Sequence, residues 1–115
     1  MTKVAIFAFR EDANCFSHVL INAMDMHARG YEIRLIMEGD AVKLLPGLAT
    51  EGGPLSGLWQ KAKAAGIVSG VCRGCATKMG TVPSAETQGL ALLDDLSGHP
   101  SIGGFRDQGY EILVF

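Results

Sequence analysis

The chain has 115 residues, of which 48% are apolar and 19% are charged, and its formal net charge is −2. This length and composition fit a single folded domain over residues 1–115 and exclude an intrinsically disordered chain. The basic residues are scattered along the chain, which argues against a nucleic-acid groove or a patch that binds anionic membranes.

The first predicted element is a strand over residues 3–9, which are almost all apolar. A short run of this kind fits a strand buried on both faces of a parallel sheet. The run is far shorter than the roughly twenty residues of a membrane span. It is also too short for the core of a signal peptide, so we expect a cytoplasmic protein without membrane association.

An amphipathic helix is predicted next, because apolar residues recur at helical spacing from Phe16 to Met24. Asp12 is expected to cap this helix and Gly30 to end it. Residues 31–37 then predict a second strand.

The middle of the chain contains a loop region, a further helix and a third strand. We expect Pro46 to break a short apolar piece within residues 41–53. Pro54 opens a helix that Gly66 terminates. Residues 67–72 predict the third strand.

The last third of the chain is less regular. Residues 90–96 fit either a short buried strand or the end of a helix that begins near Ser84, because periodicity does not separate the two in so short a run. A small helix is predicted over 102–105 and a final strand over 110–115. Strands that alternate with helices predict an α/β fold, a three-layer α/β/α sandwich around a mostly parallel sheet of four or five strands.

Thiols and a carboxylate follow three of the predicted strands. Cys15 comes after the first strand, Glu38 closes the second, and Cys72 and Cys75 close the third. Because the carboxyl ends of parallel strands meet at one edge of the sheet, we expect these groups to converge there. This convergence is the main functional signal of the sequence.

The Cys72-x-x-Cys75 spacing suits a disulfide, a metal clip, or a nucleophile with a resolving partner. Arg73 and a helix N-terminus near Cys75 are expected to favour a thiolate. The alternative interpretation is that Cys72 is a buried strand residue without chemistry. Cys15, in the first turn of its helix, is either a second reactive thiol or a packed residue.

Three other polar residues have two interpretations each. His18 is able to reach the same edge, but a surface histidine is the favoured interpretation. Glu38 is either a proton acceptor beside the thiols or, slightly favoured, a helix-capping carboxylate. His99 is interpreted as a cap or a packed ring rather than as a catalytic group.

Zinc is a further alternative. Cys15-x-x-His18 together with Cys72-x-x-Cys75 makes a nominal set of four zinc ligands. The two pairs lie far apart in the sequence, and a domain with this much core should fold without metal, so we expect no resident cofactor. The chain also lacks the glycine motif of dinucleotide sites, the phosphate loop of nucleotide hydrolases and the serine elbow of α/β hydrolases.

The order of these motifs resembles the DsrE/DsrF-like family. The resemblance spans nearly the whole chain, although each motif is short. It rests on Cys15-Phe-Ser-His18, Glu38-Gly39, the segment from Val71 to Gly80, Gln88-Gly89-Leu90, Gly98-His99-Pro100-Ser101 and the segment from Gly109 to Phe115.

This resemblance implies a three-layer fold with a five-stranded parallel sheet that assembles into trimers or hexamers. It also implies intracellular sulfur trafficking, in which a cysteine accepts sulfane sulfur as a persulfide from a donor protein and passes it to an acceptor protein. The active thiol of the family maps to Cys72 or Cys75. We expect Cys75, because a residue past the end of the strand is more accessible than one still within the sheet.

On this interpretation Arg73, His18 and Glu38 support the reactive thiol. Cys15 or the second cysteine of the pair would resolve the persulfide to a disulfide. The alternative function is a non-catalytic oligomeric binding module, whose thiols hold a metal or a small ligand at the same edge of the sheet.

Overall fold

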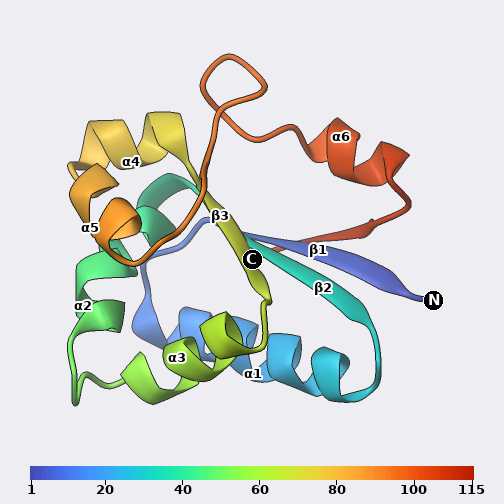
Figure 1. Cartoon of the computed structure of the whole chain (residues 1–115), viewed down its shortest axis with the longest axis horizontal. Helices are drawn as coiled ribbons and strands as arrows, with labels where there is room; N and C mark the ends of the chain where they lie inside the picture. Colours follow the sequence, from blue (N-terminus) through green and yellow to red (C-terminus); the bar gives the residue numbers. More distant parts are fainter.

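The computed structural model describes residues 1–115 and contains five strands, six α-helices and one 3₁₀ helix (Figure 1). In chain order these elements are β1 (Lys3–Ala8), α1 (Ala13–Ala28), β2 (Glu32–Met37), the 3₁₀ helix η1 (Gly39–Leu44), α2 (Leu45–Ala49), α3 (Ser56–Ala64), β3 (Val68–Cys72), α4 (Arg73–Met79), α5 (Val82–Thr87), β4 (Leu92–Leu93), α6 (Ile102–Asp107) and β5 (Glu111–Val114).

The five strands form one parallel sheet in the order β4-β3-β2-β1-β5. The chain lays down the first four strands in sequence, and then returns through α6 to place β5 on the far side of β1. This arrangement confirms the predicted three-layer α/β/α sandwich and fixes the strand number at five. β1 is paired on both sides, which explains why its sequence is almost entirely apolar.

The two faces of the sheet carry cores of different size. Alternate strand residues such as Ile6 and Leu35 belong to a cluster of 20 buried residues that includes residues of α1 to α5. The opposite face has a cluster of four buried residues, with Phe105 of α6 packed edge-on against Phe7 at 5.5 Å between ring centroids. Figure 1 shows α1 and α3 on one side of the strands and α6 on the other. The second layer of helices is therefore thin.

The predicted limits of the first helix agree with the structure. The Asp12 side chain accepts a hydrogen bond from the backbone N–H of Cys15 at 3.0 Å and caps α1. Gly30 follows the last turn with a φ of +87°, the left-handed conformation that glycine adopts without strain. The cap places Cys15 in the first turn of α1.

One local prediction needs correction, and one ambiguity is resolved in favour of a short strand. Pro46 does not break the chain but lies in the first turn of α2, where its missing N–H costs no helical hydrogen bond. The ambiguous region around residues 90–96 contains only the two-residue strand β4, and the helix expected near Ser84 is α5, which ends at Thr87. β4 lies so close to β3 that a Cβ on Gly70 would come within 2.8 Å of the Ala91 carbonyl oxygen.

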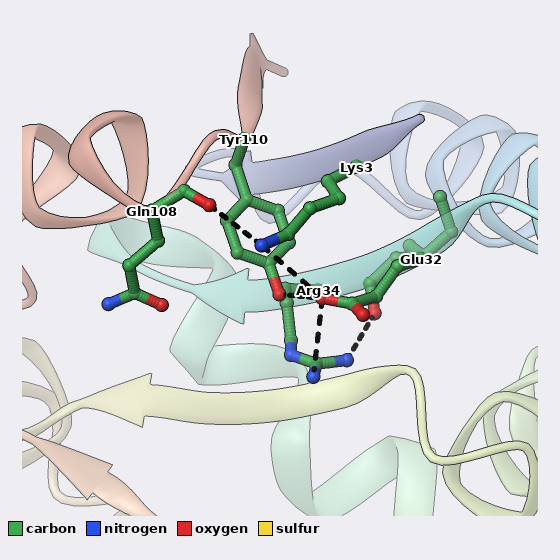
Figure 2. A network of polar contacts seen from close by, with 6 residues as sticks. Lys3, Glu32, Arg34, Gln108 and Tyr110 are labelled. Atoms are coloured by element: carbon green, nitrogen blue, oxygen red, sulfur yellow. Dashed lines mark hydrogen bonds and ion pairs between the residues drawn. The ribbon is translucent and has the colours of Figure 1, made fainter. Parts of the chain in front are cut away.

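A polar network ties the returning segment to the amino ends of β1 and β2 (Figure 2). The Tyr110 hydroxyl donates a hydrogen bond to the Glu32 carboxylate, and the Lys3 ammonium donates one to the Gln108 carbonyl at 2.7 Å. Arg34 pairs with Glu32 at 3.7 Å. The hydrogen bond from Tyr110 holds the pKa of Glu32 below its usual value.

No helix of the structure combines the length and the apolarity that crossing a bilayer requires.

Candidate functional site

Four side chains meet where β2 and β3 end. Glu38 follows β2 directly, Cys72 is the last residue of β3, Cys75 lies in the first turn of α4, and His99 lies between β4 and α6. One potential ligand atom from each of them lies within 4.8 Å of those of the other three. The edge predicted from the strand ends therefore brings together a carboxyl group, two thiols and an imidazole. We call these four residues the edge cluster.

The shortest contact in the edge cluster joins Cys72 and His99. The Cys72 Sγ lies 3.0 Å from the His99 Nδ1, and the Cys75 Sγ lies 3.9 Å from the same nitrogen. The Cys72 Sγ also accepts a hydrogen bond from the backbone N–H of Cys75 at 3.3 Å, and so caps α4. The cap fixes the backbone between the two cysteines. Both sulfurs therefore lie near the same nitrogen of the imidazole, Nδ1 of His99.

A tight turn presents His99 to the cysteines. The backbone groups of Leu96 and His99 exchange two hydrogen bonds of 2.7 and 2.9 Å. The two residues between them, Ser97 and Gly98, have φ values of +50° and +86°, which is the pattern of a type I′ turn. Pro100, which follows, is buried and anchors the exit from the turn.

Gly74 is the position that allows the turn to approach α4. Its backbone N–H donates a hydrogen bond to the Gly98 carbonyl at 2.8 Å. A Cβ on Gly74 would lie 3.1 Å from the His99 Cε1, closer than side chains normally pack. A glycine between the two cysteines is therefore what lets the imidazole reach both sulfurs.

Arg73 has a different role from the one expected. Its guanidinium Nε donates a hydrogen bond to the Asp94 carboxylate at 2.7 Å. Arg73 therefore binds the segment that leads to His99 and not the thiols. Both side chains are about half exposed, and such a pair contributes little to the free energy of folding. Arg73 helps to position the 94–99 segment, and no contact to either thiol supports the expected stabilisation of a thiolate.

Glu38 is the most unusual carboxyl group of the chain. Only 6% of its surface is exposed, and its side chain makes no hydrogen bond or ion pair. It occupies the residue before η1 without a side-chain capping bond, so the favoured capping interpretation is wrong. Burial raises the pKa of Glu38 to about 7. The carboxyl group instead belongs to the edge cluster, as the alternative interpretation expected.

The two cysteines of the pair differ in accessibility. Cys72 is fully buried, and burial raises the pKa of its thiol to about 12. Cys75 is half-buried, one turn further along the chain. The expectation that Cys75 is the more accessible thiol agrees with this geometry. Cys72 is both a buried strand residue and a member of the edge cluster.

The other two predicted site residues lie outside the edge cluster. Cys15 is half-buried in α1 and lines a cavity of about 10 Å³, which holds no more than one water molecule. His18 is exposed on the surface of α1. The nominal zinc set of Cys15, His18, Cys72 and Cys75 is therefore not assembled. The reason is the strand order, because β2 lies between β1, which precedes these α1 residues, and β3.

Two residues of the site had no clear signal in the sequence. His99 was expected to be a cap or a packed ring, and Gly74 was not singled out. The signal that existed was Ser97-Gly98 before the histidine, a dipeptide compatible with a tight turn. The contact of His99 with Cys72 spans 27 residues and depends on how that turn docks on α4.

The edge cluster has no ligand cavity. None of the four cavities of the structure is lined by any of its residues. Small-molecule sites are normally concave pockets of several hundred Å³. The arrangement therefore suits covalent thiol chemistry or an ion held directly by the side chains, rather than a bound molecule.

Comparison with known proteins places the chain among archaeal relatives. It is 34% identical over 96 residues to an uncharacterized protein of Methanocaldococcus jannaschii, which covers 84% of this chain and 76% of the relative. The chain belongs to the family of that archaeal protein. Two uncharacterized proteins of Archaeoglobus fulgidus match shorter segments, with 46% identity over 37 residues and 44% over 39 residues. No protein-family profile matches the chain.

A solved structure has the same fold. A conserved protein of unknown function from Bacteroides thetaiotaomicron superposes with a TM-score of 0.74, covering 98% of this chain and 94% of that protein. The two sequences are 17% identical, so the similarity concerns the fold alone.

Proposed function

We propose that this protein is a DsrE/DsrF-like sulfur carrier, which holds sulfane sulfur as a persulfide on Cys75 and passes it to an acceptor protein. The observation that carries the proposal is a half-buried thiol just past the end of β3, with a second thiol and an imidazole beside it. Reactive cysteines occur in such partly exposed positions next to a group that takes their proton.

Sulfur loading is a thiol exchange at the outer sulfur of a donor persulfide. The imidazole of His99, 3.9 Å from the Cys75 Sγ, accepts the proton of the thiol. The thiolate attacks the outer sulfur, a new S–S bond forms on Cys75, and the S–S bond of the donor breaks. The donor leaves as a thiolate and takes a proton back. The products are one donor thiol and one Cys75 persulfide, and no external oxidant or reductant is needed.

Cys72 is the resolving thiol in this scheme. Its attack on the inner sulfur of the Cys75 persulfide would give a Cys72–Cys75 disulfide and release hydrogen sulfide. Because burial raises the pKa of Cys72 to about 12, this thiol stays protonated at neutral pH. The buried thiol therefore attacks slowly, which preserves the persulfide for the acceptor.

The surroundings of the thiols support protein donors and acceptors. No cavity lies at the edge cluster, so a small sulfur donor would react there from solution without a binding pocket, whereas the half-buried Cys75 at the rim of the sheet is open to a docked protein. All three cysteines are free thiols, which suits the reducing cytoplasm. The trimeric or hexameric assembly stays a prediction of the resemblance.

The experiment is sulfur loading followed by peptide mapping. Reduced, metal-free protein is incubated with inorganic polysulfide, alkylated, and analysed by intact mass and by peptide mass spectrometry. We expect one added sulfur atom on Cys75, unchanged loading in Cys15→Ser, and none in Cys75→Ser. Cys15→Ser is the matched control because it removes a half-buried thiol outside the edge cluster. Sulfur found on Cys15 instead, or equal loading of Cys75→Ser, would refute the assignment.

A further inference from the structure

The edge cluster has the composition of a metal site. We propose that Glu38, Cys72, Cys75 and His99 bind one thiophilic divalent cation of the zinc class. This inference goes beyond sulfur carrying, because it assigns a ligand to the cluster and requires no sulfur transfer. It also replaces the α1 pair of the nominal zinc set by Glu38 and His99.

The distances between the donor atoms are close to those of a tetrahedral zinc site. Bonds of about 2.3 Å to sulfur and about 2.05 Å to nitrogen place a sulfur and a nitrogen ligand about 3.6 Å apart, and two sulfurs about 3.8 Å apart. The His99 Nδ1 lies 3.0 Å from the Cys72 Sγ and 3.9 Å from the Cys75 Sγ, on either side of that value. All four donor atoms lie within 4.8 Å of one another. Shifts of about 1 Å or less therefore close the site around an ion.

The kinds of donor atom select the class of cation. Two thiols, one imidazole nitrogen and one carboxylate oxygen are the donors that zinc and similar ions take in proteins. Calcium and magnesium prefer oxygen donors throughout. With both thiols ionised, the cluster offers three negative charges to a divalent ion. A hard cation is therefore the wrong partner for this site.

Glu38 provides an independent reason to expect a cation. The residue is buried, its side chain makes no hydrogen bond and no ion pair, and it contributes its oxygen to the edge cluster. A negative charge is unfavourable in such a largely buried position unless a counter-charge lies beside it. A bound cation is the partner that this carboxyl group lacks.

Three of the four ligands, Glu38, Cys72 and Cys75, also come from well-fixed backbone. Glu38 and Cys72 lie at the ends of two paired strands, and Cys72 caps the helix that carries Cys75. The turn that carries His99 is held by the hydrogen bond from the Gly74 N–H to the Gly98 carbonyl. Preorganised ligands lower the conformational cost of binding an ion.

Metal and sulfur would compete for Cys75. A thiolate that ligates a cation is not free to attack a persulfide, so a bound ion blocks sulfur loading. This consequence rests on the proposed function, whereas the metal site itself does not.

The experiment is a cobalt titration of the reduced protein after removal of metal with a chelator. Cobalt is the probe because thiolate ligands give it a charge-transfer absorption, and a tetrahedral site gives intense visible bands. We expect saturation at one equivalent, and displacement of cobalt by one equivalent of zinc. Reduced wild-type protein that shows no thiolate charge-transfer band would overturn the proposal.

Variants distinguish the edge cluster from the nominal zinc set that includes Cys15 and His18. Glu38→Gln, His99→Gln and Cys72→Ser should each weaken cobalt binding by at least roughly 10–100-fold, because each alters a ligand and the loss of a group that merely orients a ligand already costs that much. Cys15→Ser and His18→Ala should bind as the wild type does. Circular dichroism of each variant checks its folding, and Glu38→Gln keeps the side-chain shape if the cysteine variant fails. Wild-type affinity in both Glu38→Gln and His99→Gln, or loss of binding in Cys15→Ser, contradicts the assignment.

The two experiments test the metal site and the sulfur carrier independently, so the failure of one proposal is distinguished from the failure of the other. The cobalt titration contains no sulfur donor, and the sulfur loading is measured on metal-free protein. Metal binding without loading of Cys75 refutes the carrier alone, and loading without metal binding refutes the metal site alone.

Discussion

Gly74 and His99 are packed so closely that a side chain at residue 74 would be crowded: a Cβ there would lie 3.1 Å from the His99 Cε1 and 3.0 Å from the Gly98 carbonyl oxygen. Gly74, one of the two residues between the cysteines, thus limits how closely the imidazole approaches the sulfurs. The geometry of the edge cluster depends on a position that carries no functional group.

Gly74→Ala should therefore weaken both the site and the fold. Alanine normally stabilises a helix by about 0.5–1 kcal/mol relative to glycine, but here the Cβ pushes against the turn that carries His99. We expect lower urea stability and weaker cobalt binding. Gly57→Ala is the matched control, since Gly57 is also the second residue of a helix and a Cβ there meets nothing within 4 Å. Equal stabilisation by the two substitutions would show that the contact is unimportant.

Ser97→Asn should stabilise the protein. Ser97 is the one non-glycine residue with a positive φ, at +50°, and asparagine adopts this conformation more readily than serine. We expect a gain of about 0.5–1 kcal/mol in the free energy of unfolding, measured by urea denaturation. Ser97→Val should lower it, because a β-branched residue is strained there. A stabilising valine would mean that the type I′ turn does not form in solution.

The stability of the metal-free, reduced protein should fall as pH rises through about 7. Burial raises the pKa of Glu38 to about 7 from its ordinary 4.5, so the folded chain keeps a proton that the unfolded chain has released. The resulting stabilisation is complete below pH 4.5 and is lost as pH rises through the pKa of the folded state, with a total of about 3 kcal/mol.

Glu38→Gln removes this titration. Urea unfolding of wild type and variant across this range should give a difference in stability that changes by about 3 kcal/mol in the stated direction. Parallel pH profiles of the two proteins would show that Glu38 ionises normally in the folded state.

Tyr110→Phe should raise the pKa of Glu32. The Tyr110 hydroxyl is the main cause of the lowered pKa of this carboxylate, with smaller contributions from Arg34 and Lys3. The stabilisation that Glu32 provides is present above its ordinary pKa of 4.5 and is lost as pH falls through the lower pKa of the folded state. A carboxyl-carbon NMR titration measures the change. Tyr31→Phe, which removes a neighbouring hydroxyl that makes no hydrogen bond, should leave the pKa of Glu32 unchanged.

The sequence predicts the layout of the sheet well because the signals are local and strong. A strand paired on both sides must be apolar throughout, as residues 4–8 are, and a helix that begins in water needs a cap such as Asp12. The region of β4 was ambiguous, because a strand of two residues is too short to show the alternation of apolar and polar residues that identifies a strand. Pro46 was misjudged because the same residue breaks a helix interior and suits a first turn.

The candidate site was predictable only in part. Glu38, Cys72 and Cys75 were found because each lies at or just after the end of a strand, and strand ends converge in any parallel sheet. Cys15 also follows a strand, but that strand, β1, is not adjacent to β3. The order of strands in the sheet cannot be predicted from local sequence patterns. The contribution of His99 depends on a left-handed turn docking against Gly74, which is a tertiary contact.

The brevity of β4 has a kinetic consequence. Its two residues pair with the end of β3, and the segment that follows leads directly to His99. Cys72 and Cys75 are attached to the sheet interior, whereas the imidazole is attached to its weakest edge. Brief local opening of this edge would withdraw His99 while both thiols stay in place, long before the domain unfolds. The amide protons of Val71 and Gly74, which bond to Ala91 and Gly98, should then exchange with solvent faster than those in the middle of β1. The time for which the edge cluster stays complete is thus set by the opening rate of two residues.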